Sequence, residues 1–270
     1  MLNRETLGQG SNLTLLHGWA ADNGVWRDWI NTYLAPHFTC HLIELPGFGQ
    51  SAPIEAETPE AIRTAWRNAV IEALPDAPTA LLGWSLGGLV AQDVSLVAPD
   101  RVTRLIGLCT SPRFVQVEGW RHGVPPKLIV DFLQALAVDA GALLKRFWLL
   151  QWQGDRQAKV LMRQFMQEMR GRSLPTLRGL EQGLVLLRTL DFRAQLPGLA
   201  QPTLWLLGAK DPLIPVSWVE QLVQLQPHGQ VKVLPHAAHL PFRSHPAETA
   251  EAICRFCGQA EALPARTEGA

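Results

Sequence analysis

The chain has 270 residues, of which 47% are hydrophobic and 18% are charged, so it holds ample material for a buried core. Basic and acidic residues number 24 each, which leaves no net charge and argues against a nucleic-acid-binding protein. The first ten residues lack the apolar segment of a signal peptide, and no stretch of 18 apolar residues exists. We therefore expect a cytoplasmic protein with no membrane segment, and a monomer.

Short apolar runs alternate with helical patterns along the chain. Pro59–Leu74 is a predicted helix because apolar residues recur every four positions, and Thr58 is its predicted N-cap. Strand–helix alternation of this kind predicts an α/β fold with a mostly parallel sheet flanked by helices. Six runs are predicted strands: Asn12–His17, Phe38–Leu45, Thr79–Trp84, Val102–Thr110, Thr203–Gly208 and Gln230–Leu234.

The alternation stops at Pro112 and resumes near Pro202. We interpret residues 112–190 as a helical cap inserted into a core made of residues 1–111 and 191–257. Residues 258–270 are small and polar, and we expect them to be a disordered tail.

The four cysteines give no sign of a redox or metal site. Cys254 and Cys257 form a CxxC pair inside a terminal helical pattern, and no second Cys/His pair accompanies them. Cys40 and Cys109 lie in apolar strands, where a free thiol packs as a small hydrophobic group. We therefore expect partly buried thiols and no metal.

Gly83, Ser85 and Gly87 form the pattern G-x-S-x-G between a predicted strand and the predicted helix Leu89–Ala98. A sharp strand-to-helix turn places such a serine above the sheet, and the flanking glycines leave room for close backbone contacts. The pattern predicts the nucleophile elbow of an α/β-hydrolase fold, with Ser85 as nucleophile.

A serine nucleophile needs a base, and the base needs an orienting carboxylate; in this fold they follow the serine in the order acid, then histidine. Asp211 comes just after the strand Thr203–Gly208, where loops of α/β sheets converge, although an Asp-Pro turn is the alternative interpretation. His239 lies between the last strand and the last helix, and we favour it as the base over His236 and His245.

The segment from Leu15 to Trp19 ends the first predicted strand. In this fold one oxyanion amide follows the nucleophile and another lies in this early loop, so we assign the N–H groups of Leu86 and Trp19. We interpret His17 as pinning the loop rather than as a second base, and the Trp19 indole as one wall of a pocket.

The predicted cap is basic. Residues 112–190 hold twelve basic and six acidic residues, a net charge of +6 against −6 for the rest of the chain. Arg156, Lys159, Arg163 and Arg170 are spaced to share one helical face. This face is either an ordinary solvated surface or a docking surface for an acidic partner.

Four segments together resemble one family: HGW at His17–Trp19, LPGFGQS at Leu45–Ser51, LGWSLGGLVA at Leu82–Ala91 and AAHLPFRSHPAE at Ala237–Glu248. The chain resembles the pimeloyl-[acyl-carrier protein] methyl ester esterases, the carboxylesterases of biotin synthesis, over roughly residues 10–256. The resemblance implies hydrolysis of the methyl ester of a pimeloyl chain on acyl carrier protein, without a cofactor.

The resemblance also implies roles for individual residues. Ser85, Asp211 and His239 match the catalytic positions, and Trp19 and Leu86 match the oxyanion positions. Ala142 stands where the family can have a further arginine. The remaining matches are a substrate-binding stretch, Phe147, Trp148, Leu149, Leu150 and Gln151, and three residues that grip the carrier protein, Arg146, Lys159 and Arg163.

Two other functions remain open. A broad short-chain carboxylesterase or lactonase would use the same catalytic residues on free small esters. A binding protein with this fold but without catalysis would have a broken triad, whereas this sequence has all three residues in order.

Overall fold

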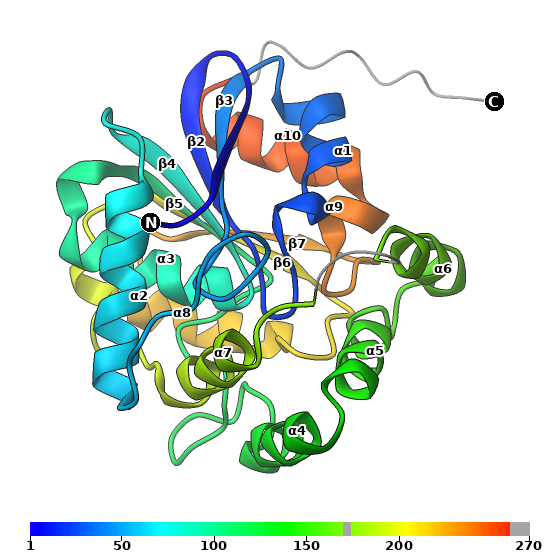
Figure 1. Ribbon diagram of the computed structural model, residues 1–270. Coiled ribbons are helices and arrows are strands. Elements are labelled where there is room, and N and C mark those ends of the chain that lie inside the picture. Colours follow the sequence, from blue (N-terminus) through cyan, green and yellow to red (C-terminus); the bar gives the residue numbers. More distant parts are fainter. Residues whose placement is uncertain (170–173, 260–270) are drawn as a thin grey trace.

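A computed structural model describes residues 1–169 and 174–259 of the chain. Its centre is a seven-stranded sheet with the order β1-β3-β2-β4-β5-β6-β7 (Figure 1), in which every neighbouring pair is parallel except the pair of β1 and β3. The strands are β1 Arg4–Gly8, β2 Ser11–Leu16, β3 Phe38–Ile43, β4 Thr79–Trp84, β5 Val102–Leu108, β6 Thr203–Gly208 and β7 Gln230–Leu234.

Helices cover both faces of the sheet. Figure 1 shows α2 and α3 on one side and α1 and α10 on the other. None of the described helices is long and apolar enough to cross a membrane. The α-helices are α1 Arg27–Trp29, α2 Pro59–Ala73, α3 Leu86–Val97, α4 Pro126–Val138, α5 Ala140–Gln151, α6 Ala158–Glu168, α7 Leu177–Thr189, α8 Val219–Leu225, α9 Pro241–Ser244 and α10 Pro246–Phe256, and a π-helical turn, η2, spans Ile30–Leu34.

All six predicted strands are present, within two residues of their expected ends. The predicted helix after Thr58 is also present, and the Thr58 hydroxyl accepts a hydrogen bond from the Ala61 amide. The edge strand β1 was not predicted, because it is half exposed and carries Arg4, Glu5 and Thr6 instead of an apolar run.

The segment between β5 and β6 holds the four helices α4 to α7. Our expectation that four basic residues share one helix there is wrong for Arg156, which lies in a turn before α6 begins at Ala158. Arg170 lies outside the described residues, as do residues 260–270 of the predicted tail. The first two residues of that tail are ordered, because the amides of Gly258 and Gln259 donate to carbonyls at the end of α10. All four cysteines are free, and Cys40, Cys109 and Cys254 are buried.

Candidate active site

Ser85 occupies the sharp turn between β4 and α3. Its backbone has φ 54° and ψ −117°, a conformation that an L-residue seldom adopts and that lets α3 begin at Leu86, three residues earlier than expected. A Cβ on Gly83 would lie 2.2 Å from the Gly87 carbonyl oxygen, and one on Gly87 would lie 2.3 Å from the Leu16 oxygen. The two glycines are therefore required by close backbone packing at this elbow.

Asp211 and His239 form a buried pair. The His239 Nδ1–H group donates to Asp211 Oδ2 over 2.8 Å, and the two side chains are 0% and 1% exposed. The other carboxylate oxygen, Oδ1, accepts hydrogen bonds from the amides of Leu213 (2.8 Å) and Ile214 (3.0 Å). The carboxylate is thus fixed through Oδ1 by its own turn, while Oδ2 orients the imidazole, so the Asp-Pro turn is compatible with the predicted role as acid.

The backbone of His239 is anchored from two directions. The Trp84 indole N–H donates to the His239 carbonyl oxygen (2.9 Å), and the His239 amide donates to the carbonyl of Gln151 at the end of α5 (3.3 Å). Trp84 immediately precedes the candidate nucleophile, so the loop of the base is tied directly to the elbow. The competing histidine His236 is exposed, and His245 bonds to its neighbour Ser244.

No hydrogen bond joins the Ser85 hydroxyl to His239 among the described residues. His239 Nε2 is buried and has no hydrogen-bond partner there. A buried nitrogen without a partner is costly, and here it is the ring nitrogen on the far side from Asp211. The geometry leaves this nitrogen available as an acceptor for a proton, and such contacts often tighten only when substrate binds.

The loop after β2 lies against the elbow. A Cβ on Gly18 would lie 3.0 Å from the Trp84 ring and 3.2 Å from Ser85 Cβ, so a larger residue here would press on the elbow. His17 holds this loop as expected: its Nδ1–H group donates to the Gly18 carbonyl (2.8 Å), and its Nε2 accepts from the Leu45 amide (3.0 Å). Among the hydrogen bonds of the described chain, none uses the Trp19 or Leu86 amide as donor, so both remain available to an oxyanion.

The residues of α5 divide between the interior and the surface. Phe147 packs edge-to-face on the Trp19 ring (4.8 Å between centroids), and the Trp148 indole N–H donates to the Ala20 carbonyl (3.1 Å). Gln151 is buried, and Leu150 is half-buried. Leu149 is 43% exposed and lies apart from the others, so the structure brings together only part of the predicted stretch.

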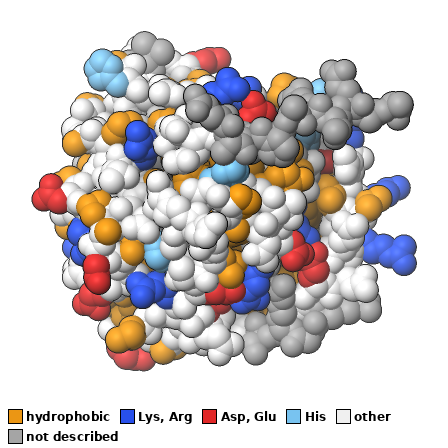
Figure 2. Space-filling view, turned by 90° about the horizontal axis from the view of Figure 1, so that it is seen from above, with side chains coloured by type: hydrophobic (Ala, Val, Ile, Leu, Met, Phe, Trp, Pro, Cys, Tyr) orange, Lys and Arg blue, Asp and Glu red, His pale blue; other side chains and the backbone are white. Residues whose placement is uncertain are grey.

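The three predicted docking residues lie on the outer faces of the inserted helices. Arg146 is on α5, and Lys159 and Arg163 are on α6; all three are exposed. In the described part of the chain none of them forms an ion pair. Figure 2 shows basic side chains projecting at the right-hand edge, the side of the molecule on which Figure 1 shows α6.

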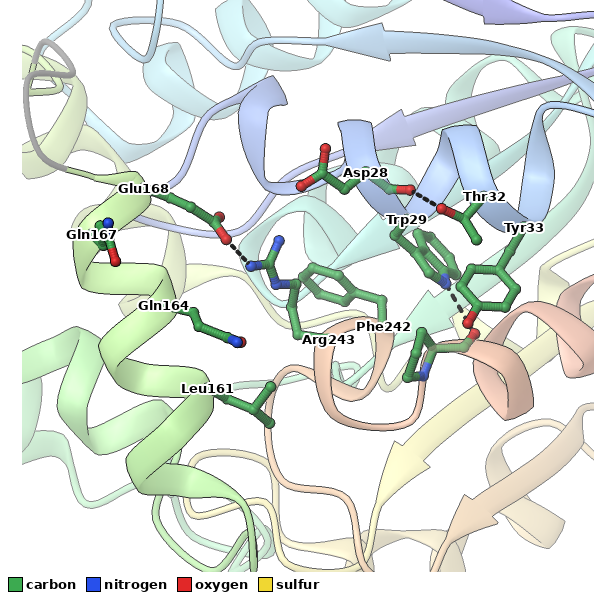
Figure 3. Close-up of a pocket in the computed structure, with 11 residues that line it drawn as sticks. Asp28, Trp29, Thr32, Tyr33, Leu161, Gln164, Gln167, Glu168, Phe242 and Arg243 are labelled. Carbon is green, nitrogen blue, oxygen red and sulfur yellow. Dashed lines mark hydrogen bonds and ion pairs between the residues drawn. The ribbon is translucent and has the colours of Figure 1, made fainter. Parts of the chain in front are cut away.

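A cavity of about 630 Å³ lies between α6, α9 and the helical segment of α1 and η2. Figure 3 shows Arg243 of α9 reaching Glu168 of α6 across it, as an ion pair. Phe242, which also lines the cavity, packs against Trp84 (5.1 Å between centroids). The candidate triad does not line this cavity, which instead separates α6 from the core beside the helix that follows His239.

Two side chains after β5 were missed by sequence reasoning. The Thr110 hydroxyl donates to the Ser85 carbonyl (2.9 Å), and Cys109 lies beside the buried pair. One Cys109, one Asp211 and one His239 ligand atom lie within 4.8 Å of one another, a spacing that could hold a metal ion. The imidazole and the carboxylate already satisfy each other by a hydrogen bond, however, so their geometry fits proton transfer better. The only sequence signal that could have indicated Cys109 and Thr110 was their position at the end of a predicted strand, since the carboxyl ends of parallel strands meet at one edge of the sheet.

Comparison with known proteins gives three kinds of match. The family model of the alpha/beta hydrolase fold matches residues 12–246. A pimeloyl-[acyl-carrier protein] methyl ester esterase of Photobacterium profundum is 37% identical over 252 residues, covering 93% of this chain and 96% of that protein. One of Klebsiella pneumoniae is 39% identical over 251 residues, covering 92% and 95%.

Solved structures agree on the fold. An esterase from Exiguobacterium antarcticum has a TM-score of 0.82 at 23% identity, with 95% of each chain covered. The enol-lactonase from Burkholderia xenovorans LB400 has a TM-score of 0.79 at 17% identity, covering 95% of this chain and 96% of that one. The identity and coverage of the sequence relatives go further than the shared fold. The chain belongs to the alpha/beta hydrolase fold family and, within it, to the family of the pimeloyl-[acyl-carrier protein] methyl ester esterases.

Proposed function

We propose that this protein hydrolyses the methyl ester of a pimeloyl chain carried on acyl carrier protein, as part of biotin synthesis. The observation that carries the chemistry is the buried hydrogen bond between His239 and Asp211, placed beside a serine on a strained elbow. The substrate is supported by relatives that bear this activity in their names at 37–39% identity over more than nine-tenths of the chain.

The proposed reaction begins with proton transfer from Ser85 to His239. The hydrogen bond to Asp211 places a proton on Nδ1, so the free electron pair is on Nε2, the unpartnered nitrogen. Ser85 Oγ attacks the ester carbonyl, and the amides of Trp19 and Leu86 stabilise the oxyanion. The imidazolium, whose positive charge Asp211 stabilises, then protonates the departing methoxide oxygen as the C–O bond breaks, so that methanol leaves.

The second half of the reaction hydrolyses the acyl-enzyme. His239 now takes a proton from water, whose oxygen attacks the acyl carbonyl, and Ser85 leaves with the proton returned. The products are methanol and a pimeloyl chain with a free terminal carboxylate. Neither half of this reaction requires a metal or a cofactor.

We assign the inner face of α5 to the acyl chain and the outer faces of α5 and α6 to the carrier protein. Phe147 and Trp148 contact Trp19 and Ala20, Gln151 contacts the backbone of His239, and Leu150 is half-buried on the same helix, so these residues are suited to line an acyl site. Arg146, Lys159 and Arg163 are exposed and unpaired by described groups, which suits a strongly acidic partner. Leu149 faces outward, and we place it at the rim of the contact.

The test compares a methyl pimeloyl-carrier protein with dimethyl pimelate as substrates. We expect a much higher kcat/KM for the carrier-bound ester, and we expect Ser85→Ala to lower kcat on both substrates by about 10⁴-fold or more while carrier binding persists. Equal kcat/KM on both esters would favour the alternative, a broad carboxylesterase or lactonase. Near-normal hydrolysis by Ser85→Ala would reject the catalytic assignment itself.

A further inference from the structure

Cys109 occupies a strained position at the carboxyl edge of the sheet. It follows the last residue of β5, which lies between β4, the strand of the nucleophile, and β6, the strand of the acid. Its φ is +43°, in the left-handed region that L-residues seldom adopt, and its amide donates to the Leu206 carbonyl over 2.8 Å. Glycine would adopt this backbone without strain, yet the position carries a thiol.

The thiol points at both loops of the buried pair. Its sulfur lies 3.7 Å from the carbonyl oxygen of Ala238, the residue before the base. It also lies within 4.8 Å of a carboxylate oxygen of Asp211 and of one ring nitrogen of His239. Cys109 is fully buried, so these contacts exclude water.

The thiol keeps its proton at this site. Burial and the neighbouring Asp211 carboxylate hold the pKa of the Cys109 thiol well above its ordinary value. A protonated thiol is a weak hydrogen-bond donor, and the Ala238 carbonyl and the Asp211 carboxylate beside it are acceptors. A backbone hydrogen bond at Gly208 lowers the pKa of the thiol, but burial and the Asp211 carboxylate outweigh it. The reaction proposed above makes no use of this group.

We propose that Cys109 is a positioning residue, whose single S–H proton, bonded to the Ala238 carbonyl and attracted by the Asp211 carboxylate, ties the loop of the acid to the loop of the base. The inference rests on the proposed catalytic roles of Asp211 and His239. Among the described residues, the other hydrogen bonds to this pair come from neutral groups: the amides of Leu213 and Ile214, the Trp84 indole, and the carbonyls of Gly208 and Gln151. Lys210, the charged neighbour of Asp211, is exposed.

Three substitutions distinguish the effect of losing the thiol from the effect of relieving the backbone strain. Cys109→Ala removes the thiol and keeps the strained backbone, whereas Cys109→Gly removes both. Cys109→Ser keeps a donor with a shorter reach. The assay follows kcat, KM and the pH profile of kcat/KM on p-nitrophenyl butyrate, an ester that needs no carrier protein, and a fluorophosphonate titration counts the folded active sites.

We expect Cys109→Ala and Cys109→Gly to lower kcat by about three- to tenfold with little change in KM. We expect the midpoint of the acidic limb of the profile to move to higher pH by a few tenths of a unit in both. The reason is that a carboxylate without the thiol proton beside it attracts the imidazolium more strongly. Cys109→Ser should restore most of kcat and return the midpoint toward the wild-type value.

A Cys109→Ala profile that superimposes on the wild-type profile would overturn the proposal, as would a fall in kcat with an unchanged midpoint and no rescue by serine. A purely structural role predicts a different pattern. Only the melting temperature would then change, and it would be higher for Cys109→Gly than for Cys109→Ala, because glycine relieves the backbone strain. A separate measurement tests the catalytic assignment itself. That assignment fails if Ser85→Ala or Asp211→Asn hydrolyses the ester at the wild-type rate.

Discussion

His17 is buried at the start of the loop after β2, and in its neutral form it makes hydrogen bonds to two backbone groups. Nε2 accepts a hydrogen bond from the Leu45 amide. Protonation would add an N–H group at Nε2, so that two donors would face each other. Burial, the dominant cause, lowers the pKa of His17 below its ordinary value of 6.5. The unfolded chain therefore binds a proton at a pH at which the folded protein does not.

This difference predicts a stability that depends on pH. The contribution of His17 is fully present above about pH 6.5 and is lost as the pH falls below it, because proton uptake then favours the unfolded chain. We expect His17→Asn to be less stable than wild type at pH 7.5 but to lose less stability between about pH 7 and 5. Urea unfolding at several pH values measures this, with His245→Asn, a half-buried histidine outside the loop, as control. Parallel losses in wild type and His17→Asn would contradict the argument.

For individual residues, the sequence indicated those that lie at the ends of strands and helices. Ser85 and Asp211 each follow a predicted strand, and their spacing from neighbouring glycine or proline was visible in the chain. The part played by Cys109 was not visible, because its partners Asp211 and Ala238 lie more than 100 residues away and only the fold brings them together. A thiol inside an apolar strand looks like ordinary core until its neighbours are known.

Helix α7 fixes the indole of Trp19. The Leu180 carbonyl accepts a hydrogen bond from the Trp19 indole N–H (2.9 Å), and one turn further a Cβ on Gly183 would lie 2.6 Å from the Trp19 ring. The absence of a side chain at Gly183 therefore lets α7 pack directly on the wall of the proposed acyl site. No sequence pattern in α7 indicated this contact, because a glycine inside a helix has no periodic signature.

Gly183→Ala tests this packing. We expect it to destabilise the protein by about 1–3 kcal/mol, because the added methyl group must displace a buried ring. We also expect a lower kcat, since the amide of Trp19 is one of the two proposed oxyanion donors. Glu181→Ala, an exposed position on the same helix, should leave both quantities near the wild-type values. A Gly183→Ala protein with unchanged melting temperature and kcat would show that the ring can move without consequence.

The boundary of α6 explains why its basic face was only partly predicted. The sequence spacing placed four basic residues on one helix, but Asp155 bonds the Gln157 amide through its side chain (2.8 Å), and the helix starts only afterwards. Asx turns of this kind compete with helical hydrogen bonds, and the competition is decided by local geometry that spacing does not reveal. Lys159 and Arg163 remain on the exposed face of the helix itself.

At the level of the whole molecule, the order of strands and helices was predictable because parallel sheets need helical crossovers. The alternation of apolar runs therefore predicted six of the seven strands, and its interruption predicted the inserted helices between β5 and β6. The shape of the acyl site was not predictable, since it depends on how α5 and α7 pack on the loop of Trp19. The charge of each part could be read from composition alone.

The uneven distribution of charge along the chain predicts where a carrier-bound substrate binds. Residues 112–190 carry a net charge of +6, and the remaining residues carry −6, so an acidic carrier is attracted to the inserted helices and repelled by the rest. We expect kcat/KM for the carrier-bound ester to fall steeply between about 0.05 and 0.5 M salt, because salt screens attraction between exposed charges. Hydrolysis of dimethyl pimelate should change little over the same range, since the small ester has no charge to steer.

Reversing the charge of exposed basic residues tests which part of the surface attracts the carrier protein. We expect the combined variant Arg146→Glu, Lys159→Glu and Arg163→Glu to lower kcat/KM for the carrier-bound ester by about ten- to a hundredfold, mainly through KM, and to flatten its salt dependence. Lys232→Glu reverses an exposed charge on β7, outside the inserted helices, and serves as the control. The triple variant changes the net charge three times as much as Lys232→Glu, so if the free-energy losses of the two proteins stood in that same proportion, net charge alone would account for the effect. If only the triple variant lost activity, the carrier would have to approach across α5 and α6, and its pimeloyl ester would meet Ser85 from the side on which Gln151 holds the loop of the base.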